Sequence, residues 1–389
     1  MTRFRIAYFE PVRGLNVYGC ELLPHLAALD EVDVYTDGDT SELKETITDS
    51  FSVRPFDAFP ETNGYDQVLF QLRNNPHHVP VYEALVRHNG LTVFHETKIT
   101  GIIGAKTLCR GRRLAFLSEV LINEGPGATL RGAFDIFWRR DFERVARHEM
   151  NRQAVCCSQG VIVHNHDAEQ RLRSRYPGLP ICVVRRGVPP ARAFDTATTK
   201  AVLGLADRFP IVGSFGVIND RKRIRQALEA FAGIVDRFPS AAYVLVGQPY
   251  EFDVNAIVER FGLSVRVVVP GRVSEEDFQR YLAVVDIGIN LRYPLEGETS
   301  STALRIMSYG KPMLVTDAGS LAELPAGCTI PIKADSREVA EIRDALVRLS
   351  RSESLRREIG SAARAYVSEH RTWEQAARGY HRFIHQLSR

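Results

Sequence analysis

The chain has 389 residues, of which 44% are hydrophobic and 25% charged, and this length and composition predict a globular protein of two domains. The net charge of +3 is too small to indicate a nucleic-acid partner, and the six cysteines lack the spacing of a zinc site, as expected of reduced thiols. No apolar run approaches the ~20 residues of a membrane span, and the first residues enter a strand without a signal-peptide pattern, so we expect a cytoplasmic protein.

Strands and helices alternate through the first half of the chain. Apolar runs predict buried strands at residues 5–9, 32–35, 65–72, 91–94, 161–163 and 181–184. Helical periodicity predicts helices between them, among others at 17–29 and 81–88. This alternation predicts a doubly wound α/β sheet, whose ligands bind where the strands end.

Two features of this half are candidates for that ligand edge. Gly14 lies in the loop after the first strand, where a bare glycine indicates either a close ligand approach or a tight turn. His95 and Glu96 follow the strand at 91–94, as active-site groups or as a cap for the next helix. The residues alone leave both alternatives open.

Three polar groupings resemble metal ligands, but each has a simpler interpretation. Asp37-Gly38-Asp39 is typical of a turn, and His77-His78 of a solvated loop. His164-Asn165-His166-Asp167 is best explained as a strand end followed by an Asp N-cap. We therefore predict no metal site.

The segment 134–152 mixes aromatic and basic residues and is predicted to be a helix. Such a helix can lie on an anionic membrane surface, but its acidic residues favour an amphipathic core helix. Peripheral contact with the inner face of the membrane is thus the weaker alternative.

A Pro-, Ala- and Thr-rich segment at 189–205 is predicted to be the interdomain linker. We place the first domain at 1–190, with a helix at about 373–389 that docks back on a domain, and the second domain at 206–372.

The second half begins again with strands, predicted at 211–216, 243–246, 265–269 and 286–290. The first two end in Gly216 and Gly247, and Gly271-Arg272 follows the third. The loop 217–223 carries Arg221-Lys222-Arg223, a basic set that suits a diphosphate better than a solvated charge run because glycines lie beside it.

The stretch 296–324 then predicts a polar loop, a helix through Met307, a buried strand and a small-residue loop. Glu298 precedes a Thr-Ser-Ser-Thr cluster that can cap the helix. The free N–H groups of a helix start suit a phosphate, and a carboxylate beside them suits a sugar nucleotide.

VGSFGVINDRKRIRQALEAF and EGETSSTALRIMSYGKPMLVTDAGSLAEL resemble the donor-site segments of retaining glycosyltransferase family 4. VLFQLRNNPHH, TVFHE and VIVHNHDAEQRL resemble segments of the amino-terminal domain of that family. The resemblance implies the GT-B fold, which has two Rossmann-like doubly wound domains facing a cleft.

The resemblance also implies roles for single residues. Lys222 would neutralise the leaving diphosphate, His95 would lie near the transferred sugar, and Glu298 would hold the sugar hydroxyls. The remaining candidates for contact with the donor are Gly14, Gly216, Gly247, Arg272, Thr299, Ser300, Ser301 and Arg305.

Two positions depart from the family pattern. Val217 replaces the family's arginine, so Arg221 or Arg223 would have to supply that charge. Arg305 replaces the second glutamate of the family motif, which usually contacts the ribose; an arginine cannot accept hydrogen bonds from hydroxyls. The first glutamate falls on Gly297, between Glu296 and Glu298, and we prefer Glu298.

We therefore expect a hexosyltransferase-type enzyme (EC 2.4) of glycan or cell-envelope polysaccharide biosynthesis that is independent of metal. Its expected partners are a nucleotide-sugar donor and a sugar or lipid-linked sugar acceptor. A non-catalytic GT-B homologue that serves as a binding or scaffold subunit and a sugar-nucleotide epimerase of the same fold remain alternatives.

Overall fold

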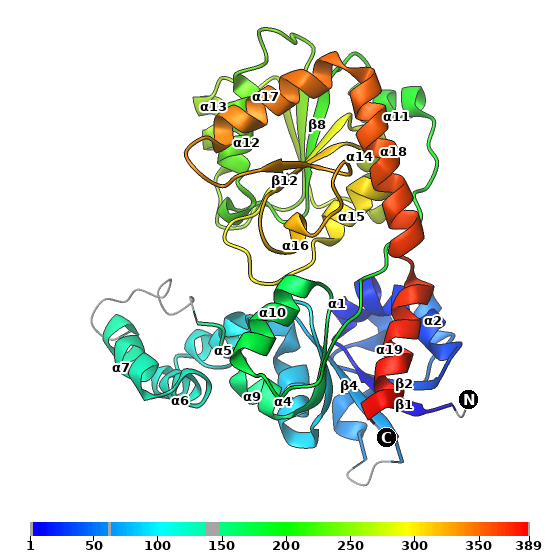
Figure 1. Cartoon of the computed structure of the whole chain (residues 1–389), viewed down its shortest axis with the longest axis vertical. Helices are drawn as coiled ribbons and strands as arrows, with labels where there is room; N and C mark the ends of the chain where they lie inside the picture. The colour runs from blue at the N-terminus through cyan, green and yellow to red at the C-terminus, as the bar shows by residue number, and fades with distance from the viewer. Residues whose placement is uncertain (1–2, 61–63, 137–147, 388–389) are drawn as a thin grey trace. The chain divides into compact units, whose positions relative to one another are not determined.

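The computed structural model describes residues 3–60, 64–136 and 148–387, which form two compact α/β units (Figure 1). Unit 1 comprises Met1–Gly187, Glu296–Thr299 and Trp373–Arg389, and unit 2 comprises Val188–Leu295 and Ser300–Thr372. The sequence pattern predicts the break at 190–206 and gives no sign that the four-residue piece Glu296–Thr299 belongs to unit 1.

Unit 1 is built on a parallel sheet of seven strands in the order β3-β2-β1-β4-β5-β6-β7. Its strands are β1 (Arg5–Phe9), β2 (Glu31–Thr36), β3 (Val53–Pro55), β4 (Gln67–Leu72), β5 (Gly90–Phe94), β6 (Ser158–Val163) and β7 (Ile181–Val183). The strand order runs outward from β1 in both directions, so the loops after β1 and β4 leave toward opposite faces of the sheet. In a doubly wound sheet, ligands bind at this point of the carboxyl edge.

Helices cover both faces of this sheet (Figure 1). The described helices of unit 1 are α1 (Val12–Gly14), α2 (Cys20–Ala27), α3 (Glu45–Thr48), α4 (Val79–His88), α5 (Thr100–Lys106), α6 (Arg113–Glu124), α7 (Pro126–Phe134), α9 (Arg152–Cys156), α10 (His166–Arg175) and α19 (Trp373–Leu387). A π-helical turn, η1 (Leu15–Gly19), joins α1 to α2. The apolar sides of α2 and α19 pack on one face, and those of α4, α5 and α10 on the other.

The carboxyl-terminal helix α19 is an integral part of unit 1 and lies alongside α2 (Figure 1). Gly160 of β6 allows its close approach, because a Cβ there would lie 2.7 Å from Leu387. Phe383 is buried in the same contact, and the hydroxyl groups of Tyr18 and Tyr380 lie 2.8 Å apart.

Unit 2 is built on a parallel sheet of six strands in the order β10-β9-β8-β11-β12-β13. Its strands are β8 (Ile211–Phe215), β9 (Ala242–Val246), β10 (Val267–Gly271), β11 (Ile287–Asn290), β12 (Met313–Thr316) and β13 (Ile330–Ile332). Here the order reverses at β8, so the loops after β8 and β11 form the ligand edge.

The helices of unit 2 also cover both faces of its sheet. They are α11 (Thr196–Val202), the turn η7 (Asp220–Lys222), α12 (Ile224–Ala232), α13 (Val254–Arg260), α14 (Glu275–Val284), α15 (Ser301–Ser308), α16 (Gly319–Ala322), α17 (Glu338–Arg351) and α18 (Glu353–His370). Helices α12, α13 and α17 pack on one face, and α14, α15 and α18 on the other.

Several local expectations were wrong. The predicted linker contains helix α11, which Asp195 caps through the backbone N–H of Thr198. The sequence pattern predicts a helix at 341–363, but the structure has two helices there, and Ser352 ends α17 and caps α18. Asn165, not Asp167, caps α10, because its side-chain oxygen accepts from the N–H of Ala168 at 2.7 Å.

The predicted helix at 134–152 is not continuous, since residues 148–151 are not helical, and its centre at 137–147 lies outside the described residues. Among the described residues, no helix combines the length and apolar character that crossing a bilayer requires.

The docking of α19 is testable with one substitution. Phe383→Ala should lower the free energy of unfolding by about 3 kcal/mol, because it leaves a cavity between α19 and the sheet. Gln386→Ala, at an exposed position of the same helix, is the control and should change stability by less than about 0.5 kcal/mol. Equal effects in a urea titration followed by circular dichroism would show that α19 is not packed as described.

Candidate functional site

In unit 2, Lys222 ends the short turn η7 that follows β8. Its Nζ atom donates a hydrogen bond to the carbonyl oxygen of Phe215, the last residue of β8. Burial of the ammonium group, with the charge of Arg292 nearby, lowers the pKa of Lys222 to about 7. A bound anion would favour the charged form, so this lysine is suited to bind one.

Gly216 and Gly247 end neighbouring strands and leave no room for side chains. A Cβ on Gly216, whose φ is +84°, would lie 2.7 Å from Nζ of Lys222. A Cβ on Gly247 would lie 2.1 Å from the carbonyl oxygen of Gly216. The two glycines therefore let the β8 and β9 ends approach each other and let the lysine lie against the backbone.

The other basic residues of this loop contact protein groups. Nε of Arg223 lies 3.1 Å from both carboxylate oxygens of Glu338, which is 2% exposed. This ion pair anchors the start of α17 and commits the Arg223 guanidinium to a protein carboxylate. Arg221 donates from Nη2 to the carbonyl oxygen of Pro294 at 3.3 Å, which ties the turn to the loop after β11.

Arg292 is a further cation beside Lys222 that the sequence pattern does not single out. It follows β11 by two residues, is half-buried and lies close enough to Lys222 to lower its pKa. Its place after a predicted strand was visible in the sequence, but its proximity to Lys222 was not, because β8 and β11 are adjacent only in the folded sheet.

The start of α15 is held by a small hydrogen-bond network. Ser300 is the N-cap: its Oγ atom accepts from the N–H of Ala303 and donates to Oδ1 of Asn290 at 3.0 Å. Nδ2 of Asn290 donates to Oγ1 of Thr302 at 2.8 Å. The network fixes the first turn, which begins at Ser301, at the end of β11, where its free backbone N–H groups can receive an anion.

Arg305 lies within α15. The Arg305 guanidinium pairs with both carboxylate oxygens of Glu275 and lies 4.4 Å from the ring centroid of Phe278, so it joins α15 to α14. Arg272 follows β10 and is exposed.

In unit 1, His95 follows β5 and is buried. Its Nε2 atom donates to Oε1 of Gln71 at 2.8 Å. The imidazole also makes an edge-to-face contact with the ring of Tyr18, with 4.7 Å between the ring centroids. Burial and the charge of Arg73 hold the pKa of His95 well below its usual range, so the imidazole is neutral.

Gly14 makes room for a buried carboxylate. A Cβ on Gly14 would lie 2.5 Å from Oε1 of Glu10, the residue that follows β1. Glu10 accepts from the hydroxyl of Tyr8 at 2.7 Å and from Nη2 of Arg73 at 3.2 Å. The sequence leaves a ligand approach and a tight turn open for Gly14; in the structure the side chain of Glu10 fills the space beside it, and contact with the donor stays a prediction.

The segment Glu296–Thr299 is held by loops of unit 1. Asn165 donates from Nδ2 to the carbonyl oxygen of Gly297 and to Oγ1 of Thr299, both at 2.9 Å. Glu296 pairs with Lys98 at 2.7 Å, and the Glu298 carboxylate accepts from the N–H of Glu296 at 2.6 Å. Glu298 is thus grouped with the unit that carries His95.

Glu96 adds a third carboxyl group to this region. Burial raises the pKa of Glu96 to about 7; the charge of Arg73 opposes that rise, and Glu298 and Glu296 add to it. Near neutral pH, Glu96 therefore exists in both protonation states.

Comparisons with known proteins bear on this site. Residues 195–366 match the family Glycosyl transferases group 1. A curated relative, the 2-deoxystreptamine glucosyltransferase of Streptomyces kanamyceticus, is 28% identical over 170 residues, which cover 42% of this chain and only 43% of the relative.

Solved structures extend the likeness from the group 1 segment to the whole chain. HepE of Anabaena, solved in complex with UDP and glucose, is 16% identical and has a TM-score of 0.65; the match covers 99% of this chain and 100% of the HepE chain. The sucrose-phosphate synthase of Thermosynechococcus elongatus is 15% identical, with 99% of each chain covered and a TM-score of 0.63. The predicted fold class, α/β with two Rossmann-like domains of the GT-B type, is confirmed.

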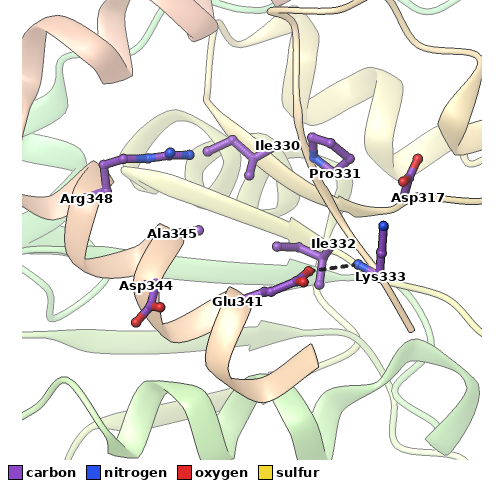
Figure 2. A pocket seen from close by; sticks show the side chains of 9 residues that line it. All are labelled: Asp317, Ile330, Pro331, Ile332, Lys333, Glu341, Asp344, Ala345 and Arg348. Carbon is purple, nitrogen blue, oxygen red and sulfur yellow. Dashed lines mark hydrogen bonds between the residues drawn. The ribbon is translucent and has the colours of Figure 1, made fainter. Parts of the chain in front are cut away.

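The group 1 segment also carries a surface pocket of about 460 Å³ beside the edge strand β13 (Figure 2). Acidic and basic side chains from α17 and the β13 end line it, among them Glu341, Arg348 and Lys333. None of the predicted site residues lines this pocket, and its mixed charges do not indicate a particular ligand.

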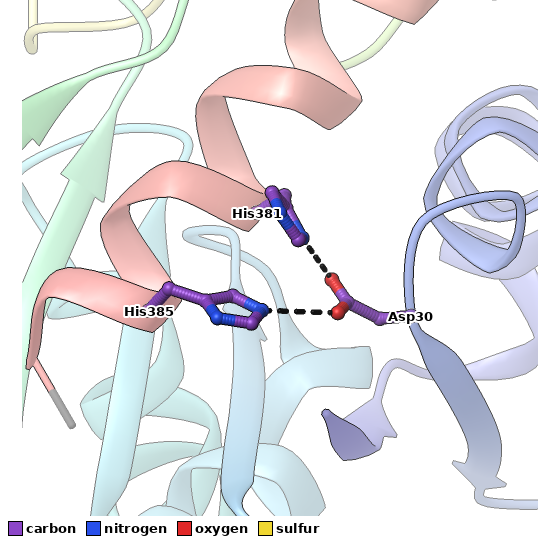
Figure 3. Close-up of side chains that lie close together, drawn as sticks. All are labelled: Asp30, His381 and His385. Carbon is purple, nitrogen blue, oxygen red and sulfur yellow. Dashed lines mark hydrogen bonds and ion pairs between the residues drawn. The ribbon is translucent and has the colours of Figure 1, made fainter. Parts of the chain in front are cut away.

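Asp30, His381 and His385 in unit 1 are a potential donor set for a cation (Figure 3). Asp30 is buried, and its oxygens accept from Nδ1 of His381 at 2.8 Å and from Nε2 of His385 at 3.2 Å. These hydrogen bonds satisfy the carboxylate and tie α19 to the loop before β2. Asp30 directly precedes β2, at the edge of the sheet opposite the carboxyl ends of the strands, and independence of metal stays a prediction.

The approach of Gly247 to Gly216 can be tested by substitution. Gly247→Ala should destabilise unit 2 by several kcal/mol, because its Cβ would collide with a backbone carbonyl. Gly262→Ala, which meets open space at a φ of +66°, should cost only about 1–2 kcal/mol of backbone strain. Thermal unfolding measures both, and equal losses would contradict the close approach.

Proposed function

We propose that this chain is a retaining, hexosyltransferase-type glycosyltransferase (EC 2.4). It would move a sugar from a nucleotide-diphosphate donor to a sugar or lipid-linked sugar acceptor in glycan or cell-envelope polysaccharide biosynthesis. The observation that carries the proposal is the position of Lys222, held against two glycines at the carboxyl end of β8. The group 1 match of the same segment supports it.

The chemistry follows from the charge that develops in the reaction. The bond between the anomeric carbon and the diphosphate breaks, and negative charge builds on the departing oxygen. Lys222 and Arg292, with the N–H groups at the start of α15, would stabilise that charge without a metal. Arg292 thus takes the place of the arginine that Val217 replaces, while Arg221 positions the loop.

Retention is expected from attack on the same face of the sugar. The acceptor oxygen forms the new bond to the anomeric carbon, and its proton passes to the departing phosphate, so no protein nucleophile is needed. Glu298 would hold hydroxyl groups of the donor sugar, and the neutral His95 would lie near the same sugar. UDP-hexoses are the first donors to test, because HepE was solved with UDP and glucose.

Lys222→Ala should lower kcat/KM for the donor by about 100-fold or more, because it removes a charge that stabilises the leaving group. Release of nucleoside diphosphate from UDP-, GDP-, ADP- and dTDP-hexoses measures this rate. Arg225→Ala, at an exposed position of α12, is the matched control and should match the wild type. Turnover should also persist in EDTA.

Other outcomes of this assay separate the alternatives. Donor binding without any turnover would favour a non-catalytic subunit, and an epimerised donor formed without acceptor would favour an epimerase. Full activity of Lys222→Ala would refute its assigned role.

The pH dependence should follow Lys222. Because burial lowers its pKa to about 7, the free protein carries the ammonium charge below pH 7 and loses it above, so kcat/KM for the anionic donor should fall as pH rises through 7. Lys222→Arg stays charged and should lack this decline. The pKa of Glu96 is also about 7, and Glu96→Gln should keep the decline of kcat/KM with pH. If the decline vanished in Glu96→Gln instead, it would belong to the Glu96 carboxyl group.

A further inference from the structure

Unit 1 gathers two guanidinium groups around one aromatic ring. Tyr18 is fully buried in the turn before α2. The guanidinium carbon of Arg73 lies 5.2 Å from its ring centroid, and that of Arg186 lies 5.0 Å from it. Trp373, the first residue of α19, meets the same ring edge to face at 5.1 Å. Arg73 follows β4 and Arg186 follows β7, so both come from the carboxyl edge of the sheet.

The two arginines are not equally compensated. Arg73 donates to the buried Glu10 at 3.2 Å. Among the described residues, no side chain or carbonyl hydrogen-bonds to Arg186, which is only 9% exposed. Burial and the charge of Arg73 lower the pKa of Arg186 to about 10, which still leaves it charged at neutral pH. Glu10 is the fully buried carboxylate beside these two cations, and Glu96, which is only partly ionised near neutral pH, interacts with Arg73.

Further donors nearby also lack acceptors. Nε of Arg73 and Nε1 of Trp373 are buried and have no hydrogen-bond partner within the described part of the chain. A Trp indole and an Arg guanidinium can only donate, so no rearrangement of these groups among themselves satisfies them. Leaving each buried N–H unpaired costs about 1–3 kcal/mol. The missing component is therefore rich in acceptors and negatively charged.

We propose that Arg73, Arg186 and Trp373 form an oxyanion site in unit 1 that binds a phosphate or carboxylate group of the acceptor substrate. The assignment to the acceptor rests on the proposed function, whereas oxyanion binding itself does not. Arg186 would supply the bidentate contact, because its N–H groups are uncommitted to the protein, and Trp373 would add one neutral donor. The site would favour acceptors that carry a sugar phosphate, a lipid-linked phosphate or a uronic acid over neutral sugars.

Trp373 offers a local probe of this site. The chain has two tryptophans, Trp138 and Trp373, so a Trp138→Phe background leaves emission from the site alone. Titration with inorganic phosphate, at an ionic strength held constant with chloride, should change that emission in a saturable way. Arg186→Gln should weaken binding by about tenfold or more, and Arg186→Lys, which keeps the charge, by less. Arg185→Gln, at the exposed neighbouring position, should bind like the parent.

Several outcomes would overturn the oxyanion site. A change in Trp373 emission that does not saturate, or that chloride produces equally, would contradict it, as would equal phosphate binding by Arg186→Gln and Arg185→Gln. A change in emission that Lys222→Ala abolishes would also contradict it, since that would place the anion in unit 2. Because Arg186→Lys keeps a cation in place, it covers the case in which Arg186→Gln does not fold. None of these titrations needs donor or acceptor, so they remain decisive even if glycosyl transfer is not found.

A second measurement decides which substrate brings the oxyanion. In donor hydrolysis without acceptor, Arg186→Gln should leave the KM for the donor within about twofold of Arg185→Gln, because an acceptor site does not contact the donor. A donor KM raised by about tenfold would overturn the acceptor assignment and give the site to the donor diphosphate.

Discussion

Each unit of this chain keeps a cation partly or wholly out of water at the carboxyl edge of its parallel sheet, and such a placement is stable only when acceptors surround the charge. In unit 2, the backbone carbonyl of Phe215 is that acceptor for Lys222, and two glycines exist to allow the contact. In unit 1, Glu10 compensates Arg73, and its carboxylate in turn requires Gly14. The glycines of both ligand edges therefore reflect where charges are buried.

The framework of this arrangement could be predicted from sequence, because it depends on local pattern. Buried strands such as β1 and β8 are continuous apolar runs, and Ser274 caps α14 as its first-turn acids indicate. The sequence pattern does not predict helix α11, because its apolar periodicity is weak and its start depends on the single N-cap Asp195. The break at Ser352 was missed because helical periodicity continues on both sides of it.

The candidate site was less accessible to sequence reasoning, since partner choice is decided by tertiary packing. Arg221, Lys222 and Arg223 are consecutive and chemically similar, yet they contact three different groups: a loop carbonyl, a strand end and a buried glutamate. The surroundings of Arg305, at a position where the resemblance implies a glutamate, likewise follow from tertiary packing. Its guanidinium has a carboxylate partner, Glu275, at the start of α14, so the exchange of charge is compensated within the unit.

The division of the chain into units has a consequence for its biosynthesis. Glu296–Thr299 and Trp373–Arg389 belong to unit 1, although most of unit 2 lies between them and Gly187 in the sequence. The ribosome therefore finishes all of unit 2 before it makes α19, which packs with α2 on one face of the first sheet. Until then, the apolar surface around Leu22, Leu26 and Ile162 lacks its cover. The nascent amino-terminal half therefore exposes apolar surface during translation, which makes it prone to aggregation at that stage.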